Sequence, residues 1–299
     1  MFAKVVSWLK LIRVHNLLLI LVGVFISVSI SQYSKDLSVE YLDIISISLF
    51  ISIPPLLVAS AGYIRNDYFD LETDRISKPW RPLVRGDIEP ETANKTALAL
   101  YLTALIYSIA SIGWATFLFT LYNILITDLY DSKFKKSGLI GNIMVSLATA
   151  NVFIYGSLAF YERYSRQISF SPYALIPFLF AFLLSISREL IKGVEDIRGD
   201  RRLGVKTLAI TRGYRETSLA SLIICLILLP ILILPLTLIF SYSYLVLSIV
   251  SIVLSIVASY RVFNASSEEE AIERAREARS ITKVSMLVGI LAFLTWLLI

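Results

Sequence analysis

The chain has 299 residues, of which 57% are hydrophobic and only 17% are charged. Soluble proteins carry roughly 25% charged residues, so this composition excludes an ordinary soluble enzyme and predicts a polytopic membrane protein. The formal net charge is +5, but the basic residues lie between apolar segments and alternate with acids, so we expect no nucleic acid partner. The only cysteine, Cys225, lies in an apolar run, which rules out an intrachain disulfide and argues against a thiolate nucleophile.

The apolar segments predict an all-α fold, since crossing about 30 Å of hydrocarbon takes roughly 20 apolar residues per helix. We expect nine transmembrane helices, bundled in a single domain over residues 1–299 around a central cavity open to the cytoplasmic side. The long apolar stretch 93–130 is divided at Ser111-Ile112-Gly113, because one helix of that length would overrun the bilayer. The expected spans are residues 15–34, 43–65, 93–112, 114–130, 138–160, 171–190, 217–238, 242–262 and 281–299.

The orientation of these spans follows from the basic residues. With nine spans, all but Lys35, Arg163 and Arg166 of the 28 lysines and arginines fall on one side of the membrane. This is a strong positive-inside bias, so we expect a multi-pass protein of the cell membrane with a cytoplasmic amino terminus and an outward carboxyl terminus. The first apolar run is too long for a signal-peptide core and lacks a cleavage site, so we interpret it as a genuine span.

An acidic segment, NDYFDLETDRISKPWRPLVRG, directly follows the second span at residues 66–86. Asn66, Asp70 and Asp74 are four residues apart, and residues at this spacing share one face of a helix. A single aspartate at a helix end is most simply a solvated residue. Several oxygen ligands on one face are harder to explain in that way and indicate a cation site.

A partial copy, EDIRGDRRLGVK, occurs at residues 195–206, where Asp196 and Asp200 repeat the four-residue spacing. Bases follow the acids in both segments, which suggests an internal repeat. The two clusters could therefore face each other and hold divalent cations for work on phosphates. Carboxylates without His or Cys nearby favour Mg²⁺ over zinc, and the only histidine, His15, lacks a second ligand at metal spacing.

Basic side chains expected on the same side as the acids could bind phosphate oxygens. They are Lys78, Arg81, Lys135, Lys136, Lys192 and Lys206. For each one singly, the positive-inside bias is the better explanation. Together with Mg²⁺ they suggest a prenyl diphosphate substrate, because cations would neutralise the departing pyrophosphate and let the allylic C–O bond ionise. An acceptor oxygen or ring carbon would then capture the allylic cation, with water excluded inside the bundle.

Both segments resemble the signatures of the UbiA superfamily of intramembrane prenyltransferases, and the likeness extends over essentially the whole chain. Its most specific part is the first segment with its trailing RISKPWRP. The resemblance implies Mg²⁺ ligation by Asn66, Asp70, Asp74, Asp196 and Asp200, the four aspartates being catalytic. It also implies diphosphate or substrate contacts by Arg13, Asn16, Asp67, Tyr130 and by Lys135 or Lys136.

Within that superfamily, the stretch SRELIKGVEDIRGDRRLGVKTLA at residues 187–209 is most similar to archaeal digeranylgeranylglyceryl phosphate synthases. That resemblance implies transfer of a geranylgeranyl group to geranylgeranylglyceryl phosphate in archaeal ether-lipid synthesis. The implied partners are a prenyl diphosphate, a lipid-like acceptor and membrane lipids, and no protein partner is implied. Many members have an aspartate where this chain has Gly193, with Glu195 as a candidate substitute.

Two alternatives remain open. The acceptor could be aromatic, as in the quinone, heme or chlorophyll-type prenyltransferases. A secondary transporter would instead place ionisable residues near the membrane midplane on interrupted helices. The central apolar runs of the fifth, seventh and ninth expected spans contain no charged residue, which favours the enzyme.

A mixed-charge run, SSEEEAIERAREAR, occupies residues 266–279. Glu270 and Arg274 are four residues apart, a spacing that supports an ion pair on one helix face. We interpret the run as a solvated helical face without a chemical role.

Overall fold

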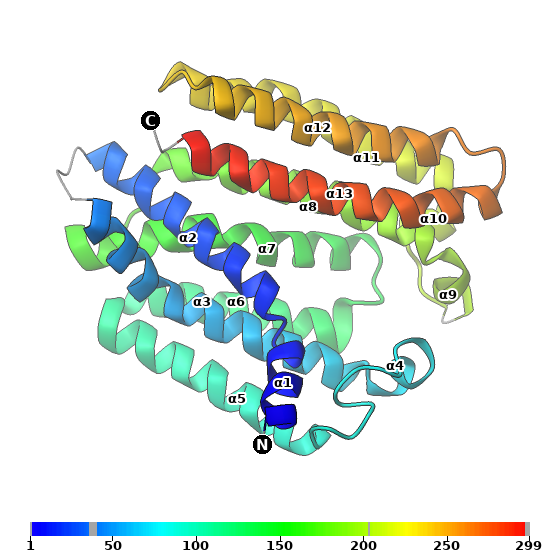
Figure 1. Cartoon of the computed structure of the whole chain (residues 1–299), viewed down its shortest axis with the longest axis horizontal. Helices are drawn as coiled ribbons and strands as arrows, with labels where there is room; N and C mark the ends of the chain where they lie inside the picture. Colours follow the sequence, from blue (N-terminus) through cyan, green and yellow to red (C-terminus); the bar gives the residue numbers. More distant parts are fainter. Residues whose placement is uncertain (1, 36–40, 203, 297–299) are drawn as a thin grey trace. The chain divides into compact units, whose positions relative to one another are not determined.

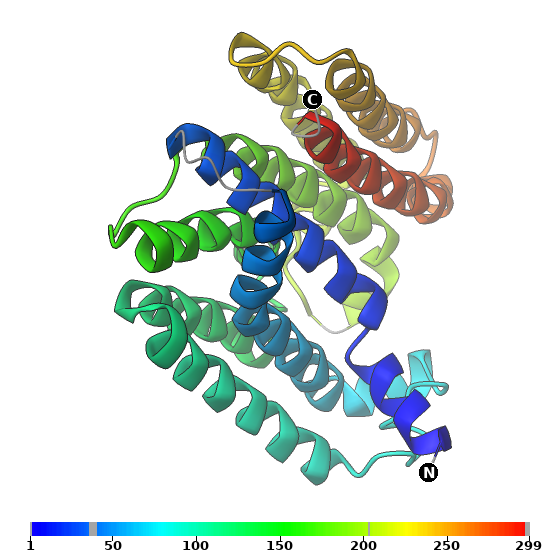
Figure 2. The ribbon, with the colours of Figure 1, turned by 60° about the vertical axis from the view of Figure 1, so that its left-hand side comes forward.

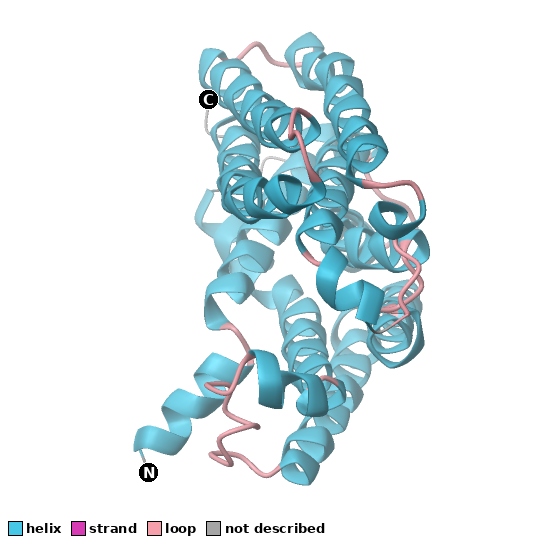
Figure 3. Cartoon of the chain, turned by 90° about the vertical axis from the view of Figure 1, so that its right-hand side faces the viewer, coloured by secondary structure: helices cyan, strands magenta, loops and turns pink. Residues whose placement is uncertain are grey.

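The computed structural model describes residues 2–35, 41–202 and 204–296, and every regular element in these ranges is helical (Figures 1 and 3). Eight helical segments of the described chain are long and apolar enough to cross a membrane. The all-α, multi-pass prediction is therefore confirmed, whereas the expected count of nine is one too many. The fourth expected span corresponds to Trp114–Leu129, an α-helix of only 16 residues that continues directly into a π-helix, Tyr130–Phe134, and it is not among these eight segments.

The chain divides into two compact units, residues 1–132 with 152–171, and residues 133–151 with 172–299. The expectation of a single domain stays a prediction. The helices of the first unit, seen from two directions in Figures 1 and 2, are α1 (Phe2–Leu11), α2 (Val14–Lys35), α3 (Tyr41–Phe69), α4 (Leu71–Ser77), α5 (Pro90–Tyr107), the π-helix η1 (Ser108–Ile112), α6 (Trp114–Leu129) and the π-helix η3 (Tyr161–Ser165). The π-helix η2 (Tyr130–Phe134) and α7 (Leu139–Phe160) contribute to both units.

Small side chains let the helices of the first unit approach closely. On α3 and α5 the buried residues Ala61, Ala93 and Ala97 belong to one apolar cluster. On α2, Ser31 lies 2.6 Å from the Ser157 hydroxyl of α7. Membrane helices associate through such small residues and hydroxyl contacts, because lipid offers no hydrophobic force to drive helix against helix.

The break between α5 and α6 occurs where the sequence predicts it. The π-helix η1 ends at Ile112, and α6 begins at Trp114. The Glu162 carboxylate accepts hydrogen bonds from the backbone nitrogens of Ala115 and Thr116 at 2.8 and 2.7 Å. A Cβ added at Gly113 would lie 2.3 Å from this carboxylate. A larger residue at this position would displace the Glu162 side chain, so Gly113 leaves the space in which Glu162 caps the first turn of α6.

The second unit consists of the beginning of α7, the 3₁₀ turns η4 (Pro172–Ala174) and η5 (Leu234–Thr237), and the helices α8 (Leu175–Glu195), α9 (Ile197–Arg202), α10 (Leu208–Thr211), α11 (Tyr214–Ile233), α12 (Tyr242–Phe263) and α13 (Glu268–Trp296). Its long helices also pack through small residues. The Ser187, Ser221 and Ser259 hydroxyls form a buried chain with links of 2.7 Å. The free Cys225 is buried and lies 3.3 Å from Ser187.

The last span was expected over residues 281–299, but its helix already begins at Glu268. Positions 297–299 lie outside the described residues. The mixed-charge run therefore forms the first half of α13, and its predicted Glu270–Arg274 ion pair is present at 2.5 Å.

Candidate active site

The first acidic segment is built around a short break between α3 and α4 at Asp70. Helical hydrogen bonds continue across the break, since Asp70 N donates to Asn66 O at 3.0 Å and Asp74 N to Asp70 O at 2.8 Å. Asn66, Asp70 and Asp74 therefore keep the shared face that their spacing predicts.

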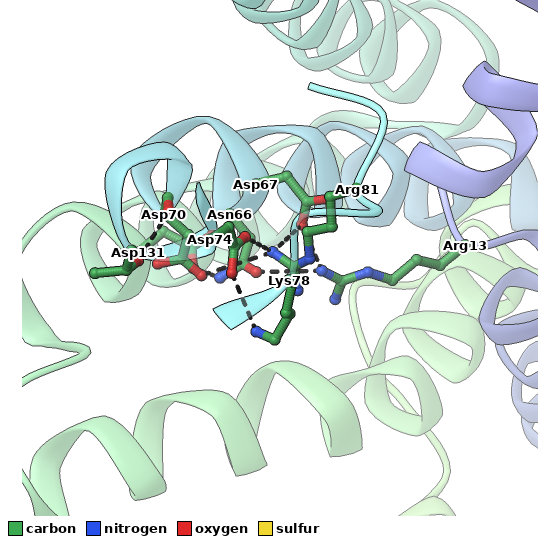
Figure 4. A network of polar contacts seen from close by, with 9 residues as sticks. Arg13, Asn66, Asp67, Asp70, Asp74, Lys78, Arg81 and Asp131 are labelled. Carbon is green, nitrogen blue, oxygen red and sulfur yellow. Dashed lines mark hydrogen bonds and ion pairs between the residues drawn. The ribbon is translucent and has the colours of Figure 1, made fainter. Parts of the chain in front are cut away.

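Two arginines neutralise this cluster (Figure 4). Arg81 Nη1 lies 2.9 Å from Asp67, 3.9 Å from Asp70 and in direct contact with Asp74. Arg13 Nη2 donates to Asp67 at 2.6 Å. The side chains of Asp67 and Asp74 are only 5% and 2% exposed. Buried charges of this kind are tolerated only when they are paired.

The residue before α2 approaches the same cluster in an unusual backbone conformation. Arg13 has a φ of 53°, in the left-handed region that costs non-glycine residues about 1–3 kcal/mol. Its guanidinium donates to Asn66 Oδ1 at 3.2 Å and lies 4.8 Å from the centre of the Tyr63 ring. The Asn16 side chain hydrogen-bonds to Tyr63. Of the other predicted contacts in this region, Lys78 Nζ lies 3.3 Å from Asp74.

The structure adds residues that the sequence analysis missed. Asn66 Nδ2 donates to Asp131 Oδ1 at 2.6 Å. Its neighbour Arg65 donates through Nε to Asp128 at 2.7 Å and through Nη1 to Asn94 at 2.5 Å. The only sequence signal for these residues was the three-residue spacing of Asp128 and Asp131, which lie just before Lys135 and Lys136.

The second acidic segment has the same local design. A break at Asp196 separates α8 from α9, and helical hydrogen bonds cross it from Asp196 N to Lys192 O at 3.0 Å and from Asp200 N to Asp196 O at 2.9 Å. Lys192 Nζ lies 3.3 Å from the buried Glu189. The shared helix–aspartate–helix design supports the suggested internal repeat.

Burial disfavours the ionised forms of the two carboxylates in this segment, Asp196 and Asp200. Burial and then the neighbouring Asp196 carboxylate raise the pKa of Asp200 to about 6, while Lys192 opposes the shift. Burial also raises the pKa of Asp196, which Lys192 partly offsets. A cation bound between them would favour the ionised forms.

This chain has Gly193 at the position where many family members have an aspartate, and the structure shows its surroundings. A Cβ added there would meet no atom within 4 Å, so nothing in the described residues replaces the missing side chain at that point. Glu195 pairs with Arg279 of α13 at 3.1 Å. Its carboxylate is thus already engaged, and Arg279 has a structural partner that the charged run did not reveal.

The loop that follows η2 and contains Lys135 and Lys136 touches the loop after α9. Gly138 has a φ of +61°, and a Cβ added there would lie 2.3 Å from the carbonyl oxygen of Lys206. This contact, inside the second unit, brings together the backbones of three predicted phosphate-binding lysines. Tyr130, for which the family resemblance implies a substrate contact, is half-buried in η2.

We expect Gly138→Ala to disturb this lysine loop, because the new methyl group needs a disfavoured φ and collides with a backbone oxygen. The KM for the prenyl diphosphate should rise about tenfold, with a loss of about 1–3 kcal/mol in stability. Steady-state kinetics and thermal unfolding would check this. Gly62→Ala is the matched control, since its Cβ would make only ordinary contacts at 3.9 Å. A wild-type KM in the Gly138 variant would contradict the expectation.

The donor set fits Mg²⁺. The first segment offers one amide and several carboxylate oxygens, whereas the described ranges contain no group of three His, Cys, Asp or Glu side chains arranged as a complete metal site. Mg²⁺ does not require one, since it usually binds one or two carboxylates and completes its octahedron with substrate phosphates and water.

The UbiA prenyltransferase family matches residues 16–287. Digeranylgeranylglyceryl phosphate synthase from Hyperthermus butylicus is 34% identical over 296 residues, covering 97% of this chain and 96% of that protein. The enzyme of the same name from Sulfurisphaera tokodaii is 33% identical, covering 97% of both.

Solved structures agree with this relationship. One concerning digeranylgeranylglyceryl phosphate synthase in membranes superposes with a TM-score of 0.76 at 28% identity, covering 99% of both chains. A UbiA homolog from Archaeoglobus fulgidus bound to DMAPP and Mg²⁺ has a TM-score of 0.63 at 16% identity, covering 96% of this chain and 99% of that one, which shows a common fold. This membrane protein is thus a prenyltransferase and belongs to the UbiA prenyltransferase family.

Proposed function

We propose that this chain transfers a geranylgeranyl group from its diphosphate to the free hydroxyl of geranylgeranylglyceryl phosphate, in a Mg²⁺-dependent reaction that releases pyrophosphate. The allylic C–O bond to the diphosphate breaks, an ether C–O bond forms, and the acceptor hydroxyl loses its proton. The names of the relatives from Hyperthermus butylicus and Sulfurisphaera tokodaii support this acceptor.

The observation that supports the chemistry most directly is the first acidic cluster. It combines oxygen ligands on one helix face with the guanidinium groups of Arg13 and Arg81. A diphosphate with bound Mg²⁺ needs oxygen ligands for the metal and cationic groups for its own oxygens. Guanidinium groups bind phosphate oxygens in a bidentate manner.

The chain's own residues would act by binding and orienting. Mg²⁺, when bound, would neutralise charge on the diphosphate leaving group. Asn66, Asp70 and Asp74 would hold it in the first segment, and Asp196 and Asp200 would do so in the second. The charge on the leaving group grows as the C–O bond breaks, so the metal that these residues would hold stabilises the transition state more than the bound substrate, which lowers the barrier.

The cations of the chain would bind the diphosphate directly. Arg13, Lys78 and Arg81 belong to the first cluster, and Lys192, Lys206 and one of the lysines 135 and 136 belong to the second unit. Asp67 has another role in this scheme. It is buried and engaged by both arginines, so we assign it the positioning of Arg13 and Arg81. Asn16 and Tyr130 would line the path of the prenyl chain.

The positive-inside bias was counted with nine spans, and on the condition that α6 also crosses the membrane it supports a cytoplasmic amino terminus and a cytoplasmic active site. An outward carboxyl terminus follows only if α6 crosses the membrane as well. Membership of a transferase family leaves the transporter alternative without support.

The test is a proteoliposome assay with labelled geranylgeranyl diphosphate, Mg²⁺ and three acceptors: geranylgeranylglyceryl phosphate, 4-hydroxybenzoate and a naphthoate. We expect labelled product with the glyceryl phosphate alone, and none when EDTA removes the metal. Product with only an aromatic acceptor would overturn the ether-lipid assignment while leaving the prenyl transfer intact.

A further inference from the structure

The Asn66 amide is held at both ends (Figure 4). Its oxygen accepts from Arg13 Nη2 at 3.2 Å, and its nitrogen donates to Asp131 Oδ1 at 2.6 Å. A side-chain amide has one accepting and one donating end, and only the oxygen can bind a cation. The partner of the nitrogen therefore decides which end faces the acidic cluster.

Asp131 is brought to this position by an anchored piece of backbone. Three residues earlier, Asp128 accepts from Arg65 Nε at 2.7 Å, which ties the end of α6 to the end of α3. The chain then widens into the π-helix η2, which contains Asp131. Such wide turns re-aim side chains and are frequent at functional sites. Two adjacent residues of α3, Arg65 and Asn66, are thus each bound by a carboxylate from this one segment.

We propose that Asp131 is a positioning residue, whose carboxylate holds the nitrogen of the Asn66 amide and so leaves Oδ1, the end next to Arg13, as the atom available to a cation. The inference rests on the proposed metal-dependent function. Asp131 acts here through Asn66 and is not itself a ligand. A charge-assisted hydrogen bond as short as 2.6 Å is strong enough to fix an amide rotamer, and residues that orient metal ligands in this way typically contribute 10- to 100-fold to metal affinity.

The experiment measures binding of Mn²⁺ alone to the full-length protein in detergent by electron paramagnetic resonance, without any substrate. We expect Asp131→Ala to weaken Mn²⁺ binding about 10- to 100-fold. Asp131→Asn keeps an oxygen that can accept from the Asn66 amide, so it should remain within about threefold of wild type. The control is Glu91→Ala, which removes a mostly exposed carboxylate of the same unit and should bind Mn²⁺ normally.

A double-mutant cycle separates positioning from direct ligation. If Asp131 acts through Asn66, adding Asp131→Ala to Asn66→Ala should weaken binding no further. Additive losses, or an Asp131→Asn variant as weak as Asp131→Ala, would show that the charge of Asp131 matters by itself and would overturn the inference.

The two proposals fail in different ways. Weakened binding in Asn66→Ala combined with wild-type binding in Asp131→Ala would overturn the positioning role and leave the metal-dependent function standing. Wild-type protein that binds no Mn²⁺, with Asn66→Ala unchanged from it, would overturn both. Thermal unfolding of each variant shows that the compared proteins are folded.

Discussion

Asp70→Ala and Asp196→Ala should each abolish Mg²⁺-dependent release of pyrophosphate, with a fall in kcat of about 10²- to 10³-fold or more. Each substitution removes a carboxylate from the face that both segments keep across their helix breaks. Because these oxygens would act on charge that develops in the transition state, the loss should appear in kcat more than in KM. A coupled pyrophosphate assay in proteoliposomes measures both constants.

Glu72→Ala is the matched control for Asp70→Ala. Glu72 lies in α4, which begins directly after Asp70. Its side chain is 80% exposed and forms an ion pair with Arg75. We expect near wild-type turnover there. Undiminished turnover in both aspartate variants would refute the assignment of the acidic segments to catalysis.

Arg81→Ala should be the most destabilising single change in the first cluster. The guanidinium is 16% exposed and contacts two aspartates that are almost fully buried. Removing one partner of a buried ion pair typically costs about 3–5 kcal/mol, since an uncompensated charge stays behind. Thermal unfolding of the purified protein in detergent without divalent cations should show a Tm several degrees lower.

Two further measurements make this prediction specific. Arg85→Ala removes an arginine from the same loop that is 55% exposed, and it should leave Tm nearly unchanged because exposed pairs contribute little. Added Mg²⁺ should restore part of the Tm of the Arg81 variant, because the metal ion supplies positive charge in place of the missing guanidinium. A wild-type Tm for Arg81→Ala would show that Arg81 does not neutralise the cluster.

The features that could be predicted from the sequence are those set by local chemistry. The lengths of the apolar runs located the helices, and the Ser111-Ile112-Gly113 stretch located the break before α6. The four-residue spacing placed Asn66, Asp70 and Asp74 on one helix face. These depend on helix periodicity and the thickness of hydrocarbon, which act within one segment.

The features that were missed depend on packing between segments. The carboxylate partners of Asn66 and Arg65 lie more than sixty positions later in the chain, and no periodicity connects them. The partner of Arg279 in the last charged run was missed for the same reason. Arg279 finds Glu195 across 84 positions, and a continuous α13 replaces the expected division between loop and span.

The cap on α6 has a consequence for how the protein is made. Thr116 and Glu162 are separated by 46 positions, so the ribosome completes α6 well before its cap exists. Backbone N–H groups without partners cost several kcal/mol in hydrocarbon. The first turn of α6 therefore lacks this cap until α7 and the segment that follows it have been synthesised.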